Sequence, residues 1–206
     1  MEQQTVNISC DQMLDRIHAQ LLSEVWHKDK LKSLVSMPLI GDVYIAFFID
    51  LTDLCGKDED TRVTLPITPE VAEGLGITAQ DAFQYSKKNL HGSCRTMAST
   101  LTMLCPEEDV PEMTPPLYVI TNDNGMKGAS AILSLEVQDT ITEMCGGPAF
   151  LLPSSVHELL ACPISVLDPP SLAEMVHEIN RAQVAPEERL SDHVFKLENH
   201  DISMVI

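Results

Sequence analysis

The segment PEEDVPEMTPP, residues 106–116, constrains the fold of this chain more than any other stretch. It holds four prolines and four acidic residues in eleven positions. Proline has no backbone N–H to donate and restricts the residue before it, so neither a helix nor a central strand can pass through this segment. We therefore predict a linker between an N-terminal helix and strand lobe, residues 1–105, and a C-terminal α/β lobe, residues 117–206.

The first lobe is predicted to begin with one long amphipathic helix. Apolar residues recur at helical spacing over residues 11–35, most clearly as far as Trp26. Ser9 followed three positions later by Gln12 is typical of a capping box at the start of a helix. We expect this helix to bury one face against the strands that follow it.

The rest of the first lobe is predicted to contain strands and short helices. β-Branched and aromatic residues favour a buried strand over Val43–Leu51, with Thr61–Ile67 as its partner. Thr68 and Thr78 each have the sequence context of a helix cap. The segment 94–105 fits a helix by its apolar residues and a strand by its threonines, so its structure stays open.

The second lobe is predicted to alternate strands and helices. In order we expect a strand at 117–121, a turn at 122–125, a helix at 135–145 capped by Ser134, extended segments at 148–153 and 156–164, a helix from Pro169, and a hairpin at 193–206. Several of these connections are too short for the crossover that parallel strands need. The predicted fold class is therefore α+β, two-lobed, with a mostly antiparallel sheet covered by helices.

The charge of the chain excludes whole classes of partner. There are 13 Lys and Arg against 31 Asp and Glu, which gives a formal net charge of −18. Such a chain repels nucleic-acid phosphates and anionic lipids, so we predict neither a nucleic-acid partner nor a membrane partner. No basic residue lies between Lys127 and Arg181. This acidic stretch is either a solubilising surface or, as we predict, a face of the C-terminal lobe that contacts another protein.

The cysteines and the first residues indicate a cytoplasmic protein. The six cysteines have no C-x-x-C spacing, so neither a zinc ribbon nor a thioredoxin-type motif is predicted. The start MEQQTVNISC has no basic region followed by an apolar one, and no apolar run approaches the ~18 residues of a membrane span. We expect reduced thiols and no cofactor.

Two His-Glu dipeptides, which begin at His157 and His177, were tested as zinc sites. A zinc hydrolase of the H-E-x-x-H type needs a second histidine four residues on, where this chain has Ala161 and Arg181. Residues 122–124 offer oxygen atoms but too few ligands for a calcium loop. No metal site is predicted.

Two enzymatic alternatives stay open beside a structural interpretation. Ser154 and Ser155 lack the flanking glycines of a nucleophile elbow, so we interpret them as turn residues whose hydroxyls bond backbone groups. The first alternative is a hydrolase that uses Ser154 or Ser155 with His157. The second is a cysteine-dependent enzyme, for which His91 and Cys94 are close in sequence but carry little information.

Four blocks of the sequence resemble a bacterial family of unknown function that is common in anaerobic Gram-positive gut bacteria. The blocks are NLHGSCRTMAST, YVITNDNGMKGASAIL, FLLPSSVHELLACPI and MVHEINRAQVAPEERLSDHVFKLE. Members of that family carry LPSS-[IV]-H-E-[VL] and LSDxV patterns in the same order. The resemblance extends over residues 42–196, and typical members have a further N-terminal region that this chain largely lacks.

The resemblance implies no activity, substrate or cofactor, but it marks residues that match the family pattern. This candidate polar cluster consists of Asn122, Gly125, Gly128, Ser154, Ser155, His157, Glu158, Ser191 and Asp192. Together with the charge pattern, it leads us to predict a non-enzymatic interaction or accessory protein of the bacterial cytoplasm.

Overall fold

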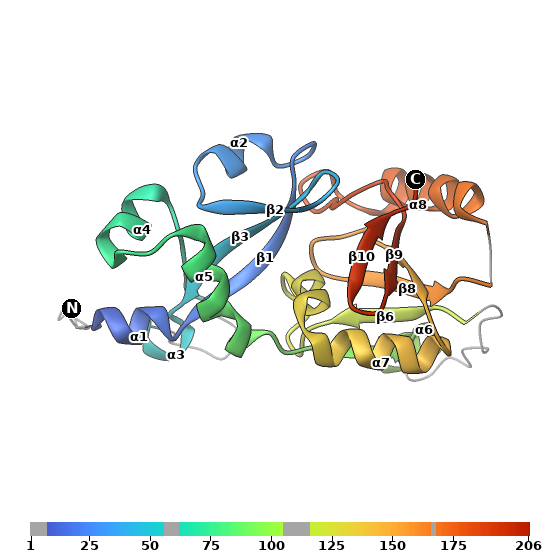
Figure 1. The fold of residues 1–206 in the computed structure, drawn as a ribbon, viewed down its shortest axis with the longest axis horizontal. Coiled ribbons are helices and arrows are strands. Elements are labelled where there is room, and N and C mark those ends of the chain that lie inside the picture. Colours follow the sequence, from blue (N-terminus) through green and yellow to red (C-terminus); the bar gives the residue numbers. More distant parts are fainter. Residues whose placement is uncertain (1–7, 56–61, 105–115, 166–167) are drawn as a thin grey trace.

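The computed structural model describes residues 8–55, 62–104, 116–165 and 168–206 of the chain. Within these residues the strands form two sheets, one of four strands and one of six, and every pair of neighbouring strands is antiparallel (Figure 1). Helices pack around both sheets. The predicted α+β class with antiparallel pairing is confirmed.

The first sheet is built around β3 (Val43–Asp50). It has the order β1 (Ile17–Ser23), β3, β2 (Ser36–Ile40), and β4 (Thr64–Pro66) also pairs with β3. The VYIAFFID sequence of β3 suits this central position, because β-branched and aromatic side chains pack well on a pleated surface. The predicted strand over 43–51 and its partner within 61–67 are both confirmed.

Short helices surround the first sheet. They are α1 (Cys10–Leu14), α2 (Lys28–Lys32), α3 (Thr52–Cys55), α4 (Pro69–Leu75), α5 (Ala79–Ser86) and the 3₁₀ turn η1 (Lys87–Asn89). The hydroxyl of Thr68 accepts from the amide of Val71, and that of Thr78 accepts from the amide of Asp81. Both predicted caps are therefore confirmed.

The predicted long helix over residues 11–35 is wrong. The capping box at Ser9 starts only the five-residue helix α1, and the chain then enters β1 and α2. Six of the seven residues of β1 are buried, including the polar Gln20 and Ser23, so burial does not alternate along the strand. A run of this kind fits a helical period as well as a strand, and pairing along its whole length with β3 decides the outcome.

The second sheet has the order β10-β9-β7-β8-β6-β5. Its strands are β5 (Ser93–Thr96), β6 (Tyr118–Thr121), β7 (Ala149–Leu152), β8 (Leu159–Pro163), β9 (Phe195–Glu198) and β10 (Asp201–Met204). The predicted terminal hairpin is β9–β10. The extended segment predicted at 156–164 becomes a strand only at Leu159, because the residues before it bend to bond the loop at 127–129.

Successive side chains of β6, β7 and β8 alternate between two apolar cores, one on each face of the second sheet. In β7, Leu151 faces the first sheet and α7 (Leu135–Cys145), whereas the next residue, Leu152, packs in the core beneath α8 (Pro169–Gln183). The same alternation occurs in β6 and β8. Figure 1 shows α7 and α8 on opposite sides of this sheet. Both helices were predicted, although the side chain of Ser134 makes no capping bond to α7.

The segment at 94–105, left open by the sequence, contains both kinds of structure. It includes the end of β5 and the helix α6 (Met97–Leu104). The predicted linker at 106–116 lies almost wholly outside the described residues, so the division into lobes at that point stays a prediction. β5 precedes it in the chain and nevertheless belongs to the second sheet.

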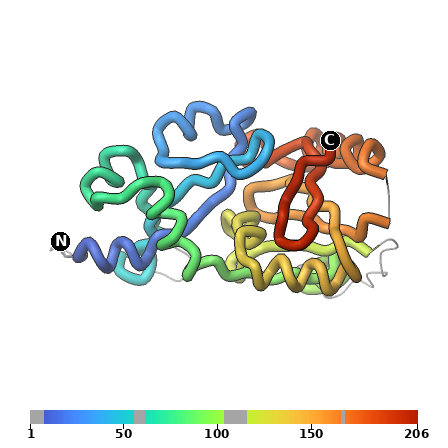
Figure 2. Tube along the Cα trace, in the orientation of Figure 1, coloured from blue at the N-terminus to red at the C-terminus, as the bar shows by residue number. Residues whose placement is uncertain are grey.

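The two sheets share one continuous apolar core, which includes Ile17 and Ile45 from the first sheet and Ile120 and Leu197 from the second. Figure 2 shows the β2–β3 hairpin, in blue, beside the C-terminal segment, in red. No helix formed by the described part of the chain has the length and apolarity to cross a membrane.

Polar groups also join the sheets, in a cluster that we name the inter-sheet clasp: Ser23, Asp42 and Ser191. Ser23 ends β1, Asp42 lies in the turn before β3, and Ser191 precedes β9. Both serine hydroxyls donate to the Asp42 carboxylate, at 3.0 Å from Ser23 and 2.6 Å from Ser191. Both serines are fully buried, whereas Asp42 is partly exposed, so the clasp connects the two sheets at the border of the buried region.

Candidate functional site

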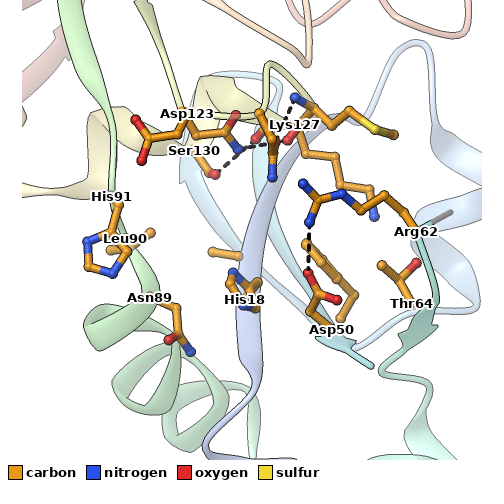
Figure 3. A pocket seen from close by; sticks show the side chains of 15 residues that line it. His18, Asp50, Arg62, Thr64, Asn89, Leu90, His91, Asp123, Lys127 and Ser130 are labelled. Carbon is orange, nitrogen blue, oxygen red and sulfur yellow. Dashed lines mark hydrogen bonds and ion pairs between the residues drawn. The ribbon is translucent and has the colours of Figure 1, made fainter. Parts of the chain in front are cut away.

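A cavity of about 170 Å³ lies between the two sheets (Figure 3). One side is lined by β1 and β3, the other by the loop at 122–127, and the segment 89–91 closes one end. A second hollow beside it shares His18, Asp50 and Arg62 with the cavity. Segments that are distant in sequence therefore meet at one polar site.

The first sheet contributes a pair of stacked rings to the cavity. His18 of β1 and Phe48 of β3 are direct cross-strand partners, with ring centroids 5.4 Å apart and an interplanar angle of 20°. Asp50 lies two residues beyond Phe48, on the same face of β3, and pairs with Arg62 at 3.8 Å. Burial lowers the pKa of His18, so its imidazole favours the neutral form.

Lys127 is the most unusual side chain of the cavity. Its ammonium nitrogen lies 3.7 Å from the centroid of the Phe48 ring. Burial, followed by the charge of Lys30, lowers the pKa of Lys127 to about 8. Among the described residues, no carboxylate lies within ion-pair distance of this ammonium group. The charge of Asp50 opposes this lowering of the pKa, but from beyond ion-pair distance. A half-buried lysine without a direct ion-pair partner costs stability, which is typical of a functional position.

The loop that carries Lys127 is held through its backbone. Lys127 has a left-handed backbone with φ of 56°, and its N–H donates to Nδ1 of His157 at 3.1 Å. The Nδ2 of Asn122 donates to the carbonyl of Met126, and the hydroxyl of Ser130 donates to the carbonyl of Lys127. These bonds fix the residue while its side chain projects into the cavity.

The candidate polar cluster predicted from the sequence is brought together only in part. Asn122, Gly125, Gly128 and His157 meet around the 122–128 loop, and Ser155 adjoins them because its hydroxyl accepts from the His157 amide at 3.0 Å. Of the whole predicted set, only Asn122 lines the cavity. Its Oδ1 atom is buried and has no hydrogen-bond partner among the described residues.

The other predicted residues lie in the connections around β8 and β9. Ser154 is buried, and Ser191 belongs to the inter-sheet clasp. Asp192 accepts from Nδ2 of Asn180 and lies 3.2 Å from Nδ1 of His177. Glu158 is half-buried just before β8. The candidate polar cluster therefore lies at two places, the 122–128 loop and the connections around β8 and β9, rather than at one.

A family model described as a family of unknown function (DUF5688) matches residues 2–198. The chain belongs to the DUF5688 family. This match confirms membership of a family of unknown function and extends beyond the residues expected from the resemblance. No curated protein and no solved structure matches the chain.

Sequence reasoning missed the main residues of the cavity in this DUF5688 chain. The sequence predicted His18 within a helix and Phe48 within a buried strand, and it did not predict Lys127 as a site residue. One signal was available for Lys127: it is the last basic residue before a long acidic stretch, and it stands between the glycines at 125 and 128.

Burial acts against three cysteines, Cys94, Cys145 and Cys162, as nucleophiles in this DUF5688 chain. It raises the pKa of the Cys94 and Cys162 thiols to about 11 each and that of Cys145 to about 12. The thiolate is the reactive form, and a raised pKa keeps the thiol protonated at neutral pH. His91 lines the cavity, whereas Cys94 does not.

The described residues contain no group of three or more His, Cys, Asp or Glu side chains arranged to hold a metal ion. The cavity offers an amine, two imidazoles, one guanidinium, amide and hydroxyl groups, and the carboxylates of Asp50 and Asp123.

Proposed function

We propose that this chain is a non-enzymatic binding protein whose inter-sheet cavity holds a small organic anion. The observation that carries the proposal is the Lys127 ammonium group, which lies in a cavity over an aromatic ring with no carboxylate paired to it in the described residues. An anionic ligand supplies the missing counter-charge and restores the stability that this group costs.

The size and lining of the cavity define the ligand further. A volume of about 170 Å³ is close to that of a cavity that accommodates benzene, so a single substituted ring or a short carboxylic acid fits. The stacked rings of His18 and Phe48 offer a flat surface, and the orphaned Oδ1 of Asn122 needs a donor such as a hydroxyl or amide. The cavity therefore suits a ligand that is a small carboxylate and also carries one hydrogen-bond donor.

The bonds of the serines support binding rather than hydrolysis. A serine nucleophile needs a hydrogen bond from its hydroxyl to a base. Over residues 8–55, 62–104, 116–165 and 168–206, neither Ser154 nor Ser155 bonds an imidazole, and Nδ1 of His157 accepts from the backbone of Lys127.

Benzoate is expected to bind more tightly than benzamide, its neutral isostere. Isothermal titration at pH 7 measures both, and Lys127→Met should weaken benzoate binding by roughly ten- to a hundredfold, because a charge-assisted bond contributes roughly 1.5–3 kcal/mol. Affinity should fall as the pH rises through about 8, where Lys127 loses its proton. Equal affinities for the two probes, or no benzoate binding at millimolar concentrations, would contradict the proposal.

A second proposal is that the acidic C-terminal half contacts a basic segment of another protein. It is supported by α7, on which Glu136, Asp139 and Glu143 are all exposed and follow at spacings of three and four residues. This spacing gathers their charges on one side of the helix.

Immobilised chain is expected to retain a discrete host protein at low salt and to release it as the salt concentration rises. The variant with E136Q, D139N and E143Q together should lose that protein, because the attracting charges are gone, whereas a D53N control should keep it. Equal retention by the triple variant would overturn this second proposal.

A further inference from the structure

We infer that Lys127 forms a reversible imine with small organic acids that carry an aldehyde or ketone, so that the cavity selects oxo acids among organic anions. This inference rests on the proposed function, because the carboxylate of such a ligand must first be accepted by the cavity.

The position of the Lys127 amine carries the inference. The nitrogen lies over the Phe48 ring, is half-buried, and has no ion-pair partner in the described residues that would hold it as an ammonium. With a pKa of about 8, roughly a tenth of the Lys127 amines are neutral at pH 7, against about one in 2,500 for an ordinary lysine. A neutral amine with a free lone pair is the nucleophile that carbonyl chemistry needs.

The reaction balances without an oxidant or reductant. The neutral amine attacks the carbonyl carbon, the carbonyl oxygen takes up a proton, and one N–H proton is lost, which gives a carbinolamine. The hydroxyl then leaves as water after a second proton reaches it from solvent at the rim, where His91 and Asp123 are exposed. The nitrogen lone pair forms the C=N bond, and hydrolysis reverses every step.

The surroundings of Lys127 suit each species on this path. The bond to His157 fixes the backbone of Lys127, and the contact with the Phe48 ring positions its amine, which limits the entropy lost when the carbonyl is attacked. The orphaned Oδ1 of Asn122 can accept from the carbinolamine hydroxyl. The protonated imine keeps its positive charge over the face of Phe48, so the cation–π contact survives the reaction.

Lys87 provides a matched control within the same chain. Its ammonium group also lies over an aromatic ring, that of Phe83, at 5.2 Å, but Lys87 is exposed and does not line the cavity. A difference in reactivity between the two lysines therefore reports the cavity rather than contact with a ring.

The test is reductive trapping with glyoxylate and sodium cyanoborohydride at pH 7, followed by peptide mass spectrometry. Lys127 is expected to gain the carboxymethyl group at least about tenfold faster than Lys87, since its neutral fraction is larger by about two orders of magnitude. An excess of benzoate should suppress labelling at Lys127 only. Lys127→Arg should abolish the fast labelling, whereas Lys87→Arg should retain it.

The outcomes separate this inference from the proposed function. Fast labelling that benzoate suppresses supports both. Fast labelling that benzoate leaves unchanged supports the reactive amine and counts against the anion site. Labelling of Lys127 no faster than that of Lys87 overturns the inference, and the separate benzoate titration then decides the proposed function alone.

Discussion

Replacing Gly128 with alanine is expected to lower the free energy of unfolding by about 3 kcal/mol, as severe overpacking does. A Cβ atom at this position would lie 2.2 Å from Oγ1 of Thr121, 2.5 Å from the carbonyl oxygen of His157 and 2.7 Å from the amide nitrogen of Asn122. Two of these are backbone atoms that cannot rotate away. Urea denaturation followed by circular dichroism measures the change as a shift of the midpoint.

Gly74→Ala is the matched control for this substitution. Gly74 lies in α4, and a Cβ atom there would meet nothing within 4 Å. Because alanine is the better helix former, this variant should be more stable than the wild type by roughly 0.5–1 kcal/mol. If Gly128→Ala unfolded at the same urea concentration as the wild type, the close packing of the loop against His157 would be refuted.

Asp42→Ala is expected to cost about 2 kcal/mol of stability, because it removes the shared acceptor of the inter-sheet clasp. The hydroxyls of Ser23 and Ser191 both donate to Asp42, and because both serines are fully buried, the variant leaves two buried hydroxyls without their carboxylate acceptor. The clasp joins the two sheets, and the variant should therefore unfold in one transition at lower urea concentration.

Asp53→Ala tests whether removing any carboxylate lowers the stability as much as Asp42→Ala does. Asp53 pairs with Arg16 at 2.7 Å, but its side chain is 64% exposed. An exposed ion pair contributes roughly 0–1 kcal/mol, so this variant should remain close to the wild type. Equal losses for Asp42→Ala and Asp53→Ala would show that burial of the clasp adds nothing.

The elements that the sequence predicted are those with local signals. The helices α4 and α5 follow threonine caps, and β3 has a composition that suits only a strand. β1 was missed because its signal is not local. Side chains on both of its faces are buried in the folded chain, and a strand buried on both faces loses the alternation that distinguishes it from a helix.

The cavity was harder to predict than the fold, because its residues meet only through tertiary structure. His18 and Phe48 face each other through the register of β1 against β3, and Lys127 reaches Phe48 only once the second sheet has packed on the first. Neither contact corresponds to a fixed spacing of residues in the sequence. Asn122 was found because it lies in a continuous block of sequence that matches the family pattern, and its bond to Met126 is local.

In the loop at 122–128, the backbone maintains the shape of the site, whereas one side chain, that of Lys127, sets its chemistry. Its geometry depends on the amide of residue 127 and on the absence of a side chain at residue 128, whereas the side chain of Lys127 contacts the Phe48 ring. A single codon change at position 127 can therefore exchange an amine for a neutral or acidic group without refolding the loop. Ligand preference in chains built on this fold can diverge at that one position while the scaffold persists.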